Sequence, residues 1–118
     1  MEDTTMIRLL GLTGLILCGF LTGARPAAAD AVVDWNEITM TAVAAGRPGP
    51  IGSVDTALVH LAMHDAVQAI EKRFEPYHVE VKGAKGSRSA ATAAAAAAAY
   101  HVLIGMYPQQ ATTLEPTY

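Results

Sequence analysis

The alternation of apolar and polar residues over 53–73 follows the 3.6-residue period of an α-helix. At about 100° per residue, one face collects apolar side chains and a neighbouring stripe collects polar ones. The apolar face holds Val59, Ala62, Met63, Ala66, Ala69 and Ile70, and the polar stripe holds His60, His64, Gln68 and Glu71. Ser53 can cap the first turn with its hydroxyl, and Asp55 then lies near the positive end of the helix dipole. The pattern predicts a helix over 53–73 with Ser53 as its N-cap.

A shorter helix is predicted over 34–45. Asp34 at the N-cap and Glu37 three positions later form a variant of the capping box. Gly46 is a natural residue to end this helix. The apolar face is made of Trp35, Ile38, Ala42 and Ala45. Because Trp35 is the only tryptophan and lies on this face, we expect it to anchor the core.

A third helix is predicted over 89–107, where the chain is rich in alanine, the strongest helix former. Its second half places large side chains on one face, namely Tyr100, Leu103, Ile104 and Tyr107. Pro108 ends it, and residues 109–118 start a partial fourth helix that Pro116 interrupts. The small alanine side chains would let neighbouring helices approach closely.

The segments between these helices are rich in residues that break helices. RPGPIG at 47–52 predicts a turn, HVEVK at 78–82 an extended segment, and GAKGSR at 83–88 an exposed loop. The predicted fold is therefore all-α, an incomplete helical bundle of three main helices and a partial fourth. Large apolar side chains are few, so the apolar faces indicate an N-terminal piece of a larger helical protein, with downstream helices or a second copy as partners.

The N-terminal residues 1–29 have the pattern of a secretory signal peptide. The apolar run LLGLTGLILCGFLT at 9–22 is shorter than a membrane-spanning helix, and small residues precede a predicted cut after Ala29. Glu2 and Asp3 are unusual before such a run, and a start at Met6 instead of Met1 would remove them. We expect an exported protein, periplasmic or secreted, with the helical segment at 30–118. The alternative is an uncleaved membrane anchor.

Composition restricts the chemistry further. The chain has 118 residues and a net charge of −3, enough for one small domain. No basic patch with interleaved aromatic residues stands out, so nucleic-acid binding is not expected. Cys18, the only cysteine, lies in the signal segment, so the exported chain would have no disulfide and no cysteine metal site.

Two histidines are the only candidate metal ligands. His60 and His64 are four residues apart, which places them on one side of a helix within reach of one ion. Zinc needs three or four protein ligands, and Leu61 stands where an H-E-x-x-H motif has glutamate. We therefore expect a polar helix face, in water or paired with a neighbouring helix, and a metal site at His60 and His64 is the alternative. Asp65 could accept hydrogen bonds from a neighbouring helix end, and no glycine-rich phosphate loop or nucleophile elbow occurs.

Several stretches taken together resemble a known family. They are DWNE at 34–37, LVHLAMHDAVQAI at 58–70, FEPY at 74–77, YHVL at 100–103 and YP at 107–108. Their order is similar to the N-terminal helical region of secreted vanadium-dependent haloperoxidase-like proteins, of the type 2 phosphatidic acid phosphatase superfamily. The resemblance covers about residues 31–118, and its signatures are packing positions rather than catalytic ones.

The resemblance implies no catalytic residue in this chain. The family's oxyanion pocket uses a lysine followed by six residues and then Arg-Pro, a Pro-Ser-Gly-His, and a Ser-Arg followed by five residues and then histidine. Here Met40 and Cys18 stand in the lysine positions, Ala94 stands in the histidine position, and Pro-Ser-Gly-His does not occur. Only a full-length relative is expected to bind vanadate or phosphate. Its reaction would be halide oxidation with peroxide or phosphate-ester hydrolysis. The resemblance therefore predicts a scaffold segment, inactive by itself; the alternative is a small secreted protein using His60 and His64 to bind a metal or haem.

Overall fold

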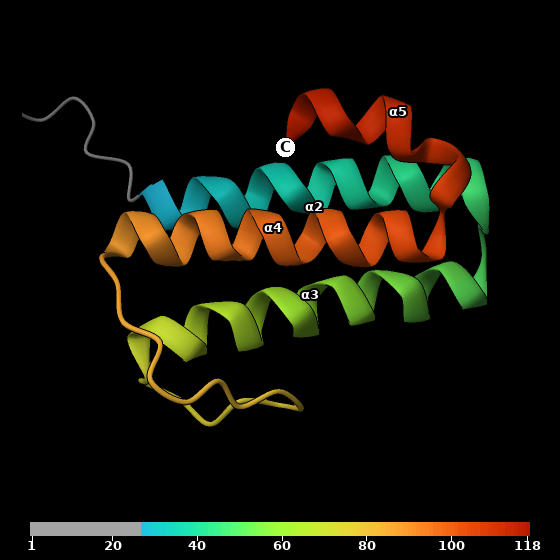
Figure 1. Cartoon of the computed structure of the whole chain (residues 1–118). Helices are drawn as coiled ribbons and strands as arrows, with labels where there is room; N and C mark the ends of the chain where they lie inside the picture. Colours follow the sequence, from blue (N-terminus) through green and yellow to red (C-terminus); the bar gives the residue numbers. More distant parts are fainter. Residues whose placement is uncertain (1–26) are drawn as a thin grey trace, which may run out of the picture.

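A computed structural model describes residues 27–118, with side chains from residue 31 onward. Three long helices, α2 (Ala27–Gly46), α3 (Pro50–Glu71) and α4 (Arg88–Met106), are followed by a short terminal group. That group is made of η1 (Pro108–Gln110), α5 (Ala111–Leu114) and η2 (Glu115–Thr117). No strand occurs within 27–118, so the predicted all-α class with a partial fourth helix is confirmed (Figure 1). The predicted apolar run at 9–22 and the alternative starts lie outside the described residues.

The start of the first helix differs from the prediction. α2 begins at Ala27 rather than at Asp34, which lies exposed inside the helix. The capping box at Asp34 and Glu37 is therefore wrong. The physical reason is the run of alanines at 27–29, which continues the helix upstream without needing a side-chain cap. The predicted cut after Ala29 falls in the first turn of α2.

The turn between α2 and α3 is shorter than predicted. Only residues 47–49 separate the two helices, and Pro50 opens α3. Proline is tolerated there because the first turn of a helix has no carbonyl partner for its N–H. Gly49 takes the N-cap position with φ of 90°, so the predicted cap at Ser53 is wrong. At the other end Lys72 adopts the left-handed conformation, and its N–H bonds to the carbonyl of Gln68 at 3.0 Å.

The core forms where α4 packs against both other long helices. α4 contacts α3 most extensively and α2 next (Figure 1). Its buried stripe repeats every four residues, with Ala91, Ala95, Ala99 and Leu103 at most 1% exposed. Alanines on this stripe let the helices lie close together. Trp35, Val59 and Met63 are buried against it, so the predicted core anchor and the predicted inner face of α3 are confirmed at these positions.

α4 has a second property that bears on location. Among the helices of residues 27–118, α4 alone is long and apolar enough to cross a membrane, judged by length and composition. Its buried stripe contacts α2 and α3. A core helix of a protein in water shows the same composition, so we assign α4 to the core.

Candidate functional site

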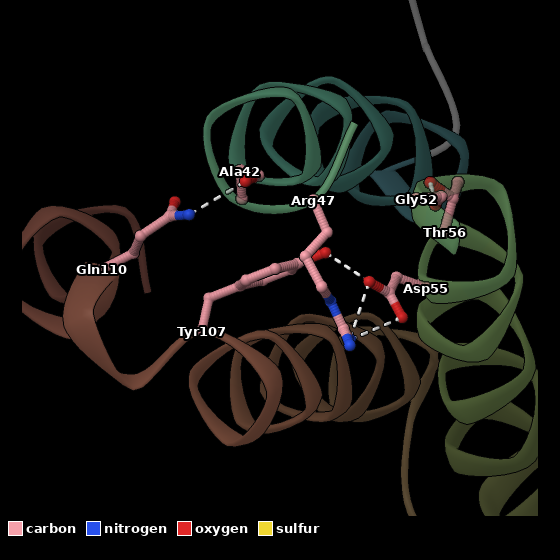
Figure 2. A network of polar contacts seen from close by, with 7 residues as sticks. All are labelled: Ala42, Arg47, Gly52, Asp55, Thr56, Tyr107 and Gln110. Carbon is pink, nitrogen blue, oxygen red and sulfur yellow. Dashed lines mark hydrogen bonds and ion pairs between the residues drawn. The ribbon is translucent and has the colours of Figure 1, made fainter. Parts of the chain in front are cut away.

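A three-residue polar network joins the α2–α3 turn to the end of α4 (Figure 2). The Tyr107 hydroxyl donates to Oδ2 of Asp55 at 2.5 Å, and Nη2 of Arg47 lies 3.0 and 2.9 Å from the two Asp55 oxygens. Tyr107 is 1% and Asp55 3% exposed, whereas the Arg47 side chain is half exposed. Burial first, and then the hydrogen bond to Asp55, raise the pKa of the Tyr107 hydroxyl. Tyr107 therefore stays protonated and keeps donating across the neutral range.

Two glycines make room for this network. A Cβ at Gly46 would lie 2.5 Å from Cδ1 of Tyr107, so the ring packs directly on the helix backbone. A Cβ at Gly52 would lie 2.5 Å from the carbonyl oxygen of Arg47, so glycine also allows the tight entry into α3. Figure 2 shows Gln110 beside the same network, its amide donating to the Ala42 carbonyl at 2.9 Å. These contacts attach the terminal group to α2.

A second polar cluster holds the connection between α3 and α4. Asp65 accepts hydrogen bonds from the backbone N–H groups of Tyr77, His78 and Val79 at 2.6, 2.9 and 2.8 Å. Oε1 of Gln68 accepts from the next backbone N–H groups upstream, those of Arg73 and Phe74. Both side chains are at least nine-tenths buried. Asp65 does accept hydrogen bonds, as considered from the sequence, but its donors lie on this connection rather than on a helix end.

The surroundings of Asp65 set its ionisation. Desolvation by burial acts to raise the pKa of this carboxyl, but the three backbone hydrogen bonds and the nearby charge of His64 outweigh it. The pKa of Asp65 is therefore below its ordinary value, and the group is ionised at neutral pH. A buried carboxylate with three amide donors fixes the backbone that it binds.

The two predicted metal ligands line one hollow but have separate partners. His60, Met63 and His64 form part of a hollow of about 260 Å³ between α3 and α2. Nε2 of His60 lies 3.0 Å from Oδ1 of Asn36, and Nε2 of His64 lies 3.1 Å from the Glu75 carbonyl oxygen. Within residues 27–118, no group of three or more His, Cys, Asp or Glu side chains is placed to hold a metal ion. Binding of a metal through either Nε2 would require its present contact to open.

α3 also has an apolar stripe outside the single apolar face predicted for this helix. Ile51, Val54 and Leu58 are 58%, 59% and 47% exposed, and their spacings of three and four place them on one side of the helix. Leu61, which is partly buried, and Asp65 continue this side at the same spacings, and Asp65 binds the connection after α3. This side of α3 is thus open and apolar in its first half.

Comparison with known proteins gave no matching family model, no matching curated protein and no matching solved structure. Every buried side-chain nitrogen and oxygen of the described residues has a hydrogen-bond partner. The buried polar atoms of both clusters therefore each have a hydrogen-bond partner, as is usual in folded proteins.

Proposed function

We propose that this chain is a scaffold: the exported N-terminal helical segment of a larger haloperoxidase- or phosphatase-like protein. The observation that carries this proposal is the open apolar stripe of Ile51, Val54 and Leu58 on α3. Spacings of three and four residues form the seam along which one helix packs on another. In the longer protein a downstream helix would cover this stripe.

The energetics favour covering the stripe. Fully burying an aliphatic side chain contributes about 1.5–3 kcal/mol relative to leaving it exposed. Three half-exposed side chains in register therefore provide a substantial driving force for a helix that fits them. The Arg47–Asp55–Tyr107 network supports this role because it fixes the start of α3, where the stripe begins.

The chemistry of the proposed full-length protein comes from the resemblance. An oxyanion pocket encoded downstream would hold vanadate or phosphate and would support halide oxidation by peroxide or hydrolysis of a phosphate ester. The present chain would position the helices that surround that pocket. This division of roles is consistent with two polar clusters that are already satisfied.

Two experiments test the scaffold. Reading the DNA past the Tyr118 codon should show a continuing frame that encodes Pro-Ser-Gly-His. In the longer protein, Leu58→Lys should lower stability by about 1.5–3 kcal/mol because it places a charge in the seam. Ala57→Lys, at an exposed neighbouring position off the stripe, is the matched control. An immediate stop with no such motif in any frame, or a purified 30–118 segment that is a stable monomer and turns over bromide or a phosphate ester, would refute the proposal.

One observation favours a second candidate function, binding of a metal or haem. His60 and His64 line the same hollow, with the sulfur-bearing Met63 in its wall. Titration of the exported protein with zinc, copper and haem tests this candidate. Sub-micromolar affinity that is lost in His64→Ala would support it, and unchanged affinity in that variant would exclude His64 as a ligand and with it a site shared by the two histidines.

A further inference from the structure

Positive charge is concentrated in the connection between α3 and α4, which we name the basic loop and define as residues 72–88. It contains five of the six Lys and Arg residues found after residue 26, namely Lys72, Arg73, Lys82, Lys85 and Arg88. Glu75 and Glu80 are its only carboxylates, so the five cations and two anions give +3, in a chain whose net charge is −3. All five cations are exposed. The sequence does not indicate this patch, because its five cations are spread over 17 positions and do not form a continuous run.

The same loop exposes its apolar side chains. Phe74 and Tyr77 are 66% and 72% exposed, and Val79 and Val81 are each about half exposed. A groove of about 640 Å³ runs between Phe74, Val79 and Val81 and the last turn of α3. Exposing two aromatic rings and two valines to water is unfavourable, and large apolar patches on proteins mark interaction surfaces.

These side chains are exposed although the backbone of the loop is held firmly to α3. Two buried side chains of α3, Asp65 and Gln68, accept five hydrogen bonds from the loop backbone. His64 adds a contact to the carbonyl of Glu75. The backbone of the loop is therefore bound to α3 while its rings, valines and cations remain in solvent.

The loop lies at the end of the molecule where the described chain begins. In Figure 1 the start of α2, the end of α3 and the start of α4 lie at one end, and the loop runs from there along α3. The apolar sequence at 9–22 ends four residues before α2 starts at Ala27. The basic loop therefore shares one end of the helical bundle with the start of α2.

We propose that the basic loop docks the protein on the surface of an anionic lipid bilayer. The cations meet the phosphate groups of the lipids, while Phe74 and Tyr77 enter the boundary between headgroups and acyl chains, which aromatic side chains favour. The remaining part of the exported chain carries −6, so an anionic surface repels it and orients the molecule with the loop toward the lipid. An acidic protein or a nucleic acid would match the cations alone, whereas a bilayer also accommodates the apolar side chains between them.

The test is binding of the exported protein to vesicles of phosphatidylcholine, alone or with roughly 30% phosphatidylglycerol, at about 0.1 M and 1 M salt. We expect binding only to the anionic vesicles, and weaker binding at high salt. Each cation near the surface changes the partition coefficient about fivefold. The double variant Lys82→Gln with Lys85→Gln should therefore lower the partition coefficient about 25-fold. Glu80→Gln removes a negative charge from the same loop and should raise the partition coefficient about fivefold. Phe74→Ser with Tyr77→Ser should lower it at both salt concentrations.

Three results would overturn the proposal. One is equal binding to neutral and anionic vesicles, which would assign membrane affinity to another part of the chain. Another is an unchanged partition coefficient in the lysine pair or in Glu80→Gln, with helical circular dichroism like that of the unsubstituted protein. The third is no effect of the aromatic pair combined with full competition by poly-glutamate or single-stranded DNA. That result would make the loop a site for polyanions in solution.

Discussion

Asp65 is the side chain on which the position of the basic loop depends most. Asp65 is 7% exposed, and its carboxylate accepts three backbone hydrogen bonds from Tyr77, His78 and Val79. In Asp65→Ala these three donors lose their acceptor at once. We expect the loop to detach from α3 while the three long helices stay folded.

The magnitude follows from the number of hydrogen bonds and from the exposure of their donors. A hydrogen bond to a charged group contributes about 1.5–3 kcal/mol, so three would sum to about 4.5–9 kcal/mol. A domain of this size is stable by only about 5–14 kcal/mol, so the full sum would approach complete unfolding. Residues 77–79 are themselves exposed, so their N–H groups bond to water once the loop opens. Local opening therefore limits the loss of global stability to about 1–3 kcal/mol.

Native-state hydrogen exchange measures both effects. In the unsubstituted protein the amides of 77–79 should be protected, and in Asp65→Ala they should exchange near the rate of an unstructured chain. The amides of Ala99 and Leu103 in α4 should stay slow. Glu80→Ala, which removes an exposed carboxylate from the same loop, is the control and should leave all these rates unchanged. Unprotected amides at 77–79 before substitution, or equal loss of protection in α4 and in the loop, would refute the reasoning.

Three further predictions concern the same clusters. Because the pKa of Asp65 is lowered in the folded state, its contribution to stability is complete above about pH 4, the unfolded value, and is lost as pH falls through the folded pKa. Between about pH 6 and pH 2 the urea midpoint should therefore fall less in Asp65→Asn than in the unsubstituted protein, and parallel curves of midpoint against pH would contradict this. Tyr107→Phe removes only the hydroxyl that donates to Asp55 and should lower the free energy of unfolding by about 1.5–3 kcal/mol in urea titrations; unchanged stability would show that the hydrogen bond contributes nothing. Gly46→Ala pushes a methyl group against the Tyr107 ring and should destabilise by about 1–3 kcal/mol, whereas Gly105→Ala, with no atom within 4 Å of the new Cβ, should stabilise by about 0.5–1 kcal/mol; thermal melts that rank the two variants in the opposite order would disprove the packing.

The sequence predicts the three long helices and much of the core because their apolar periods are local. Trp35, Val59 and Met63 are buried as that periodicity requires. The helix ends were harder to predict, because several residues could serve as caps. Pro50 and Gly49 start α3 where Ser53 was expected, since proline fits the first turn and glycine adopts a positive φ.

The polar clusters could be predicted only in part. The sequence places Asp55 near the helix dipole, but its donor Tyr107 lies 52 positions away, which no local spacing reveals. The sequence also indicates Asp65 as an acceptor, yet its donors lie on a segment whose path depends on the fold. The outer stripe of α3 lies beside the single apolar face that the helical period predicts for this helix. A signal for it existed in the spacing of Ile51, Val54 and Leu58.

The hydrogen bond from Tyr107 to Asp55 has a consequence for the order of assembly. Asp55 and Arg47 emerge early from a ribosome or an export channel, whereas Tyr107 follows only when the third long helix has passed through. Until then the Asp55 carboxylate has Arg47 as a partner but lacks its phenol donor. The fold is therefore complete only after Tyr107, directly after α4, has emerged. A chain halted before Tyr107 would lack this hydrogen bond and would be more sensitive to proteases.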